Sequence, residues 1–486
     1  MRFAGGGLAL ILASLTFAGA ANAAQPPGCA AADIKPGTTD AGLYRTIAPF
    51  EHFSSNRTQV FPHTCTLRQL TGSKRPEIAA RQSPDDFSTP YIAATRNRGQ
   101  LFVYGYGANA ATEGGYVASV DPRTLEERWR TRITDATPAN AWSYPGVQVV
   151  HGNGFIYAVY ASVMVKLDPA TGRTLARRDL PEDPDGTGAA YNGMVVLPDG
   201  RIVTKRIERG PCAVPPTAPA QVGAIGGLFC GVANALPTDV VVLDPKRLKI
   251  VSTTPAPEPI TGRITAARFD GRDYIYAAGR DELFRFRYRN GRLRLDHGWG
   301  PVTYRTGEQQ PGTGPGILGG FVVVQTNFAS SPEPMTVTAV SQRDPDRVFR
   351  VQPFAGSGTS SFIVSKAALD AATMTVVTHD TAAGRMAAIR LDPERGFKVR
   401  WRRDITALAF SALVGGAKHR EIVIPDSGTD GDEVVWLSER RGRELARSQP
   451  LAVAPAPGNI VTPGFDGRYY YVSSEGKLWE LRPSAP

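Results

Sequence analysis

The chain has 486 residues, a formal net charge of +10 and four cysteines. No apolar run approaches the roughly 20 residues that a membrane-spanning helix needs, so we expect a mature protein without a transmembrane segment. The cysteines show no C-x-x-C spacing, which disfavours a cysteine zinc site and a covalently attached c-type haem.

The first 23 residues have the three zones of a secretory signal peptide. Arg2 precedes an apolar stretch over residues 8–18, and a small-residue cleavage site ends at Ala23. We therefore expect export, to a periplasmic or secreted location, and export argues against a nucleic-acid partner. The excess positive charge comes from arginines scattered through strands and turns, which is typical of a solvated surface; a polyanionic envelope partner is the alternative.

The four cysteines fall into two local pairs that an oxidising compartment would join. We predict one disulfide between Cys29 and Cys65 and another between Cys212 and Cys230. The first would tie down residues 24–58, which we interpret as an irregular N-terminal arm.

An internal repeat dominates the remainder of the chain. Its clearest copy runs from Gly146 to Leu180 as four short β-rich runs, each closed by Gly, Asn, Asp or Pro, which predicts four antiparallel strands joined by tight turns. Equivalent positions recur at Asp121, Asp168, Asp244, Tyr288, Gln342, Asp392, Glu439 and Leu481. The repeat predicts an all-β fold, a β-propeller of about eight four-stranded blades, with seven blades as the fallback.

The last repeat stops after its third strand, so we expect an N-terminal strand to close the ring and protect both edges. We expect that strand between Gln59 and Leu70, within a single propeller over residues 59–486. Asp-Gly pairs such as Asp270-Gly271 are interpreted as hairpin turns.

The repeat unit resembles those of pyrroloquinoline-quinone-dehydrogenase-like (PQQ-like) propellers, a quinoprotein alcohol dehydrogenase-like superfamily. The best matches are LDPATG at Leu167 and VDPRTLEERW at Val120, and the resemblance covers roughly residues 90–482. It implies a fold and hardly a chemistry. The adjacent cysteines that form a ring disulfide under the cofactor in that family, and the haem module that many members add, are missing from this sequence.

A second resemblance is to gluconolactonase and senescence-marker propellers. It rests on the segment YNGMVVLPDGR, which starts at Tyr191. This resemblance implies that Asn192 would ligate a central metal. The Glu-Gly-Pro metal segment of that family is not found, and Glu113-Gly114-Gly115 is only loosely similar to it.

In a propeller, the loops that lead into each innermost strand and those between second and third strands form a funnel on one face. These loops carry aromatic, amide and hydroxyl groups that suit a polar organic ligand. The predicted ligand-binding residues are Trp142, Tyr144, Tyr191, Asn192, Arg263, Gln309, Ser360 and Asn459. Loop capping and core packing are the alternative roles for each of them.

An insertion over residues 205–237 explains the long interval between two of the repeats. It is rich in Pro, Ala and Gly, and we expect it to fold over the funnel as a lid. A structural flap is the alternative.

Alternating carboxylates in one loop offer oxygen ligands for calcium: Asp426, Asp430 and Asp432. A solvated acidic turn is the alternative. The six histidines are dispersed without the spacing of local metal pairs. No nucleophile elbow, catalytic triad order or phosphate loop occurs.

The sequence favours an exported propeller, expected to be a monomer, that binds a small-molecule ligand or an envelope protein on its lidded face. The alternative is a calcium-dependent lactonase or esterase, in which the metal would polarise a carbonyl and activate water. A quinone-dependent dehydrogenase is the least favoured reading.

Overall fold

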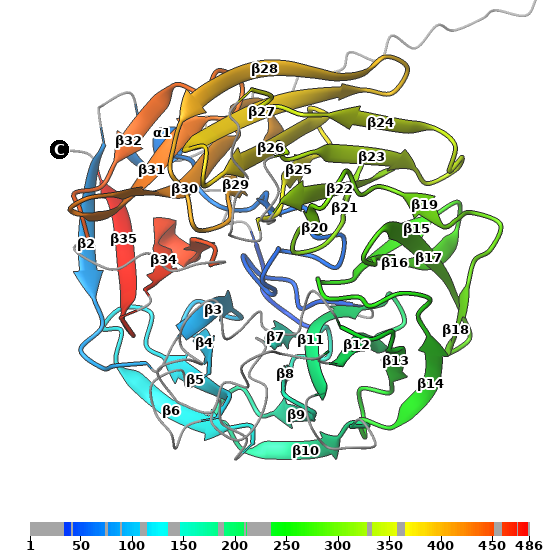
Figure 1. Ribbon diagram of the computed structural model, residues 1–486. Coiled ribbons are helices and arrows are strands. Elements are labelled where there is room, and N and C mark those ends of the chain that lie inside the picture. Colours follow the sequence, from blue (N-terminus) through cyan, green and yellow to red (C-terminus); the bar gives the residue numbers. More distant parts are fainter. Residues whose placement is uncertain are drawn as a thin grey trace, which may run out of the picture.

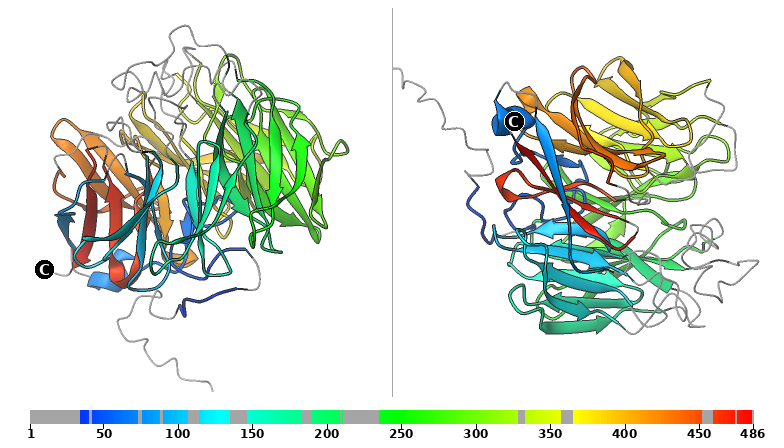
Figure 2. Two further views of the ribbon diagram at one scale, coloured as in Figure 1. Left: turned by 90° about the horizontal axis from the view of Figure 1, so that it is seen from below. Right: turned by 90° about the vertical axis from the view of Figure 1, so that its left-hand side faces the viewer.

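The computed structural model describes residues 34–39, 42–72, 76–87, 90–106, 114–134, 146–182, 189–208, 210, 235–327, 333–356, 365–451, 459–473 and 475–484. These residues form eight sheets arranged as blades of one ring (Figure 1). Figure 2 shows the ring from its side, with the strands running between its two faces. The predicted all-β propeller of eight four-stranded blades is confirmed.

The first four blades are built from consecutive strands, listed from the ring axis outward. Blade 1 is β3 (Pro90–Thr95), β4 (Leu101–Gly105), β5 (Tyr116–Val120) and β6 (Glu127–Arg132); blade 2 is β7 (Val147–Val150), β8 (Ile156–Tyr160), β9 (Val163–Leu167) and β10 (Thr174–Asp179). Blade 3 is β11 (Ala189–Val196), β12 (Ile202–Glu208), β13 (Asp239–Leu243) and β14 (Ile250–Pro255); blade 4 is β15 (Thr265–Phe269), β16 (Arg272–Ala278), β17 (Glu282–Arg289) and β18 (Arg292–Leu295), with β19 (Val302–Thr303) also on β17.

The other four blades vary this plan. Blade 5 has a divided inner strand, β20 (Gln310–Pro311) and β21 (Gly316–Leu318), followed by β22 (Phe321–Asn327), β23 (Val337–Ser341) and β24 (Val348–Val351); blade 6 is β25 (Ala368–Asp370), β26 (Thr375–Asp380), β27 (Arg385–Asp392) and β28 (Gly396–Asp404). Blade 7 is β29 (Ala412–Val414), β30 (Glu421–Gly428), β31 (Gly431–Ser438) and β32 (Glu444–Arg447); blade 8 is β33 (Thr462–Pro463), β34 (Tyr469–Val472), β35 (Leu478–Ser484) and β2 (Glu77–Gln82). The short helices are α1 (Leu67–Thr71), η2 (Ala417–His419) and η3 (Phe465–Gly467).

The repeated aspartate organises the turn between the third and fourth strands. The Asp168 carboxylate accepts hydrogen bonds from the backbone N–H groups of Ala170 at 2.8 Å and Thr171 at 3.1 Å. Asp121, Asp244 and Asp392 make the same pair of bonds in their blades. In these blades the shared role of the repeated aspartate is thus structural: its side chain stabilises the turn between the third and fourth strands.

Two of the Asp-Gly pairs, Asp270-Gly271 and Asp466-Gly467, have both residues in the left-handed region. The φ angles are 46° at Asp270 and 74° at Gly271, and 59° at Asp466 and 73° at Gly467. This geometry matches the right-handed twist of the flanking strands.

The core lies between neighbouring blades, because each blade packs on both of its faces. Middle strands such as β5 and β8 are buried at every position. Outermost strands face solvent on one side, and in β28 (Gly396–Asp404) exposed and partly buried positions alternate after the buried Gly396. The predicted solvated face for alternating arginines is seen at Arg400 and Arg402, which are exposed.

The ring is closed by an N-terminal strand, as predicted, but not at the predicted place. The closing strand is β2, which pairs antiparallel with β35 as the outermost strand of blade 8. The range between Gln59 and Leu70 instead contains β1 (Val60–Phe61), which pairs in parallel with the innermost strand β29, and α1. A blade needs an outer strand that tolerates water, and the charged sequence of β2 meets that need.

Residues 44–65 follow the ring axis, seen in dark blue at the centre of Figure 1. They bond to all eight blades, mostly through inner-strand backbone groups that face the axis. The contacts are Tyr44 and Pro49 with Val150, Ala48 with Thr95, Ser55 with Val196 and Ala266, Asn56 with Ile317, Thr58 with Leu369, Gln59 with Leu413, and Cys65 with the Tyr469 hydroxyl. The segment thus satisfies inner strand edges that would otherwise lack partners.

The described part of the predicted arm is therefore a bonded axial segment. Cys65 is fully buried and disulfide-bonded. Cys29, Cys212 and Cys230 lie outside the described residues, and so do residues 1–23. Most of the predicted lid also lies outside them; its first residues, from Lys205, form the end of strand β12. Both disulfide pairings stay predictions. No helix in the described ranges is long and apolar enough to cross a membrane.

Candidate functional site

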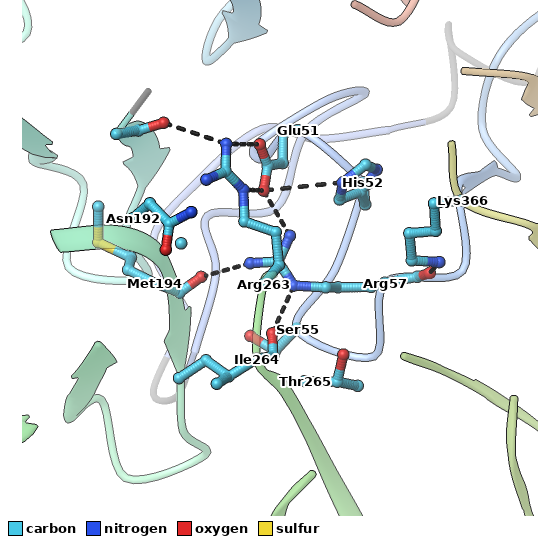
Figure 3. A network of polar contacts seen from close by, with 12 residues as sticks. Glu51, His52, Ser55, Arg57, Asn192, Met194, Arg263, Ile264, Thr265 and Lys366 are labelled. Atoms are coloured by element: carbon cyan, nitrogen blue, oxygen red, sulfur yellow. Dashed lines mark hydrogen bonds and ion pairs between the residues drawn. The ribbon is translucent and has the colours of Figure 1, made fainter. Parts of the chain in front are cut away.

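A cluster of buried charged side chains lies on the ring axis (Figure 3). Glu51, His52 and Arg57 come from the axial segment. Arg263 precedes β15, and Lys366 precedes β25, each by two residues. Lys205 belongs to β12. The loops into the innermost strands therefore bring blade residues to the axial segment from several sides.

Glu51 is the carboxylate at the centre of this cluster. It forms an ion pair with Arg57, and Arg263 Nε lies 3.1 Å from Glu51 Oε1. Burial alone would raise the pKa of Glu51, but the positive charges of Arg263 and Arg57 outweigh that effect and lower the pKa to about 2. Glu51 is therefore ionised at every physiological pH.

The two arginines also hold backbone carbonyl groups. Arg57 donates to Ile264 O at 2.5 Å and to Met194 O at 3.1 Å, and Arg263 donates to Gly146 O at 3.2 Å. Burial lowers the pKa of Arg57 to about 10, which leaves it cationic at neutral pH. Arg57 has a φ of 52°, a left-handed conformation that a non-glycine residue keeps only where its surroundings hold it.

Two buried lysines add donors without a carboxylate partner in the described part of the chain. Lys205 Nζ donates to Ile260 O at 2.5 Å and Thr261 O at 3.3 Å. Lys366 Nζ donates to Arg57 O and to Ala367 O. Burial lowers the pKa of both lysines well below the ordinary value, and the positive charge of Arg57 adds to the effect.

Several polar atoms around the cluster are buried and lack a hydrogen-bond partner among the described residues. They are Asn192 Oδ1, Gln148 Oε1, Gln59 Oε1 and both ring nitrogens of His52. His52 Nε2 lies 3.7 Å from Glu51 Oε1, and its ring packs edge-on against Phe410. Burial lowers the pKa of His52 well below its ordinary value, so the ring is neutral. The cluster therefore offers positive charge to an anion, and its buried amide oxygens can accept hydrogen bonds from a bound polar molecule or water.

Two of the predicted ligand-binding residues, Asn192 and Arg263, meet at this cluster. Figure 3 shows them side by side, and Asn192 Nδ2 donates to Thr261 O at 3.1 Å. Gly193 has a φ of 71°, and a Cβ there would lie 2.7 Å from Arg263 Cδ, so glycine is needed for this approach.

Three other predicted residues make contacts within the fold, and their ligand-binding role stays a prediction. The Tyr191 hydroxyl donates to Pro181 O at 2.8 Å, and Asn459 Nδ2 donates to Val472 O at 2.9 Å. Gln309 Nε2 donates to Glu333 O and Pro334 O. These are the loop-capping and packing roles considered as alternatives. Trp142, Tyr144 and Ser360 lie outside the described residues.

The predicted calcium ligands are not brought together. In the β30–β31 hairpin Asp426 pairs with Glu433 and Asp432 with Ser427, so Asp426 and Asp432 point to opposite faces. Arg447 binds Asp426 at 3.0 Å, and Asp432 accepts from Ser427 and Tyr471. Asp430 is exposed at the turn. Over the described ranges, no group of three or more His, Cys, Asp or Glu side chains could hold a metal ion.

Sequence reasoning missed Glu51, Arg57, Lys205 and Lys366. The first two lie in a segment outside the repeat, so no pattern marked them. A usable signal existed for Lys366, because it stands two residues before its innermost strand, as Arg263 does.

Comparison with solved structures agrees with the eight-bladed propeller fold. The chain superposes on a europium-containing methanol dehydrogenase with a TM-score of 0.56 and 10% identity over 89% of each chain. The fold is that of the PQQ-like propellers. BamB from Moraxella catarrhalis follows with a TM-score of 0.47 and 14% identity, covering 84% of this chain and 99% of that chain. At these identities the likeness shows the fold alone. No protein-family model and no curated protein matches the sequence.

The described residues do not fit a quinone bound with a hard cation. Such a cation needs several oxygen ligands, and the described residues hold no group of three or more His, Cys, Asp or Glu side chains that could supply them. The axis is filled by residues 44–65, and the one carboxylate at its centre is taken up by two arginines. No step through such a cofactor is derived.

Proposed function

We propose that this chain is an exported binding propeller that holds a small anionic ligand, without turnover, on the face formed by the loops into the innermost strands. A partner protein on that face is the other form of the same binding role. The proposal rests chiefly on one observation, the axial segment that closes the ring centre with a paired and mostly cationic cluster.

Glu51 and His52 are poorly suited to act as general bases. A general base works best with a pKa near the operating pH. The pKa of Glu51 is about 2, and that of His52 is far below neutrality because of burial. Glu51 therefore serves as a fixed negative charge, and His52 as a neutral ring packed against Phe410.

The balance of charge favours an anionic ligand. Arg57 and Arg263 share the carboxylate of Glu51, so two fixed positive charges face one negative charge. Lys205 and Lys366 add N–H donors, although burial lowers their pKa values. Low-dielectric surroundings strengthen this positive field. A small carboxylate at the face formed by the loops into the innermost strands would be attracted by it, and Asn192 would orient it.

Calorimetric titration of the mature protein with acetate, succinate and citrate tests the proposal, with succinamide as the neutral control. We expect at least one carboxylate to bind more tightly than the diamide and to be recovered unchanged. Equal binding of succinate and succinamide would refute the anionic ligand.

A calcium-dependent lactonase remains the second candidate because the buried Asn192 Oδ1 has no partner in the described part of the chain. An amide oxygen is a suitable ligand for calcium. Elemental analysis of the purified protein separates the two readings. Stoichiometric calcium together with lactone hydrolysis would establish the enzyme, and absence of stoichiometric metal would reject it.

A further inference from the structure

A large groove lies at the outer part of blade 7, on the opposite face of the ring from the loops into the innermost strands. It is lined by turns between first and second strands and between third and fourth strands, and by α1 and β2. In an antiparallel blade these turns lie at the other end from the loops that form the funnel. The groove encloses about 1420 Å³, more than a small ligand needs.

The groove is rich in unpaired positive charge. Its lining includes six exposed cations that form no ion pair within the described ranges: Arg68, Arg400, Lys418, Arg440, Arg441 and Arg443. Elsewhere many surface arginines have partners, such as Arg128 with Asp121 and Arg201 with Asp199.

The acidic residues of the groove do not cancel this charge. Glu421 and Glu439 are buried, and Glu444 is already paired with Arg403 and Arg447 at 3.1 Å and 3.0 Å. Glu77 is the exposed acid of the lining. The accessible surface of the groove is therefore strongly positive.

Two strand edges border the groove. β2 is the outermost strand of blade 8 and β32 that of blade 7, and Figure 1 shows both beside α1. Each has a sheet partner on one side only in the described part of the chain. Partly exposed apolar side chains lie between the cations, at Ile78 and Leu445.

We propose that this groove binds an extended acidic segment of a partner protein. Carboxylates of the segment would pair with the free arginines, its backbone would bond to a strand edge, and its apolar side chains would contact Ile78 and Leu445. A phosphate-rich glycan or an anionic membrane would use the charge but neither the strand edges nor the apolar contacts. The peptide is therefore the occupant that all three observations favour.

The test uses the mature protein and a peptide of about ten residues, long enough for an extended strand across the groove, in which Glu alternates with Val. The same peptide with Gln for Glu is the neutral control. We expect the acidic peptide to bind at least tenfold more tightly, and its affinity to fall as salt rises.

A variant pair locates the site. The groove variant carries Arg440→Glu, Arg441→Glu and Arg443→Glu, and the matched control carries Arg287→Glu, Arg292→Glu and Arg294→Glu in blade 4, which are also exposed. Both change the net charge equally. We expect the groove variant alone to lose the peptide by at least tenfold while both keep the wild-type circular dichroism spectrum.

Equal loss in the two variants would show general charge attraction and overturn the proposal. So would equal binding of the neutral peptide, or binding of phosphatidylglycerol vesicles without binding of the peptide. Carboxylate binding at the opposite face, formed by the loops into the innermost strands, is measured in parallel. Because it does not involve these arginines, failure of one proposal leaves the other standing.

Discussion

Arg263 Nε lies 3.1 Å from Glu51 Oε1, an ion pair between residues separated by 212 positions in the chain. Both side chains are only 3% exposed. The pair joins the axial segment to the loop before β15 in a buried environment, beside the ion pair of Glu51 with Arg57. Buried pairs of this kind are costly to break, because removal of one partner leaves the other charge uncompensated.

Glu51→Gln should therefore destabilise the protein strongly. Arg57 and Arg263 would keep their charge with no carboxylate partner, and we expect a loss of about 3–5 kcal/mol in the free energy of unfolding. Urea unfolding measures it, with Glu126→Gln, an exposed acid, as the control. The double variant Glu51→Gln, Arg263→Gln should recover part of the loss. A single variant as stable as the control would show that the pair contributes little.

The buried Glu421 predicts a pH dependence of stability. Glu421 Oε2 accepts a hydrogen bond from Leu67 N at 2.8 Å, and burial raises its pKa from 4.5 to about 7. A raised carboxyl pKa means that the folded state binds the proton more tightly than the unfolded state does. The free energy of unfolding should then be highest below pH 4.5 for this group and fall as pH rises toward 7.

Glu421→Gln should remove this dependence. The amide oxygen can still accept from Leu67 N, but it does not ionise, so the variant should be more stable than wild type at pH 8, by up to about 3 kcal/mol. At pH 4 the two should be nearly equal. Urea unfolding between pH 4 and 8 gives the comparison; parallel curves for the two proteins would contradict the raised pKa.

Peptide mapping without reductant tests the predicted disulfides, 29–65 and 212–230. Bonding between Cys212 and Cys230 would constrain the insertion and contribute about 3 kcal/mol in the chain-entropy model. We expect two crosslinked peptide pairs, and a mature N-terminus at Ala24 in the exported protein. A free thiol at Cys212 or Cys230, or a bond from Cys65 to either of them, would reject the pairing.

The repeat made the fold predictable, because a turn aspartate recurs in four of the blades and buried β-rich middle strands recur along the chain. The closing strand β2 was misplaced because an outermost strand faces water, and its sequence EIAARQ lacks a buried stripe. The one strand in the range where the closing strand was expected, residues 59–70, all of which are described, is β1, which is two residues long.

The site was predictable only in part, for the same reason. Asn192 lies in the innermost strand β11 and Arg263 two residues before the innermost strand β15, and the position of these strands in the repeat reveals where their side chains go. Glu51 and Arg57 lie in a segment whose conformation depends on contacts with all eight blades. Such contacts are long-range, so no local pattern around residues 44–65 encodes them.

Asn192→Ala is the most informative substitution at the axis. The variant loses the 3.1 Å hydrogen bond from Nδ2 to Thr261 O, so we expect a loss of about 1 kcal/mol in unfolding free energy. Thr254→Val in the same blade, which loses a 2.7 Å bond to Leu293 O, is the matched control for that loss.

The two proposed functions then give different results for Asn192→Ala. If the protein binds a carboxylate, the variant should weaken that binding by about 1–2 kcal/mol, since a hydrogen bond to the ligand is lost, while Thr254→Val leaves it unchanged. If the protein is a calcium-dependent lactonase, the variant should lower calcium affinity instead, because an oxygen ligand is removed. Titration of both variants with succinate and with calcium decides between them, and unchanged affinity for both would exclude Asn192 from the site.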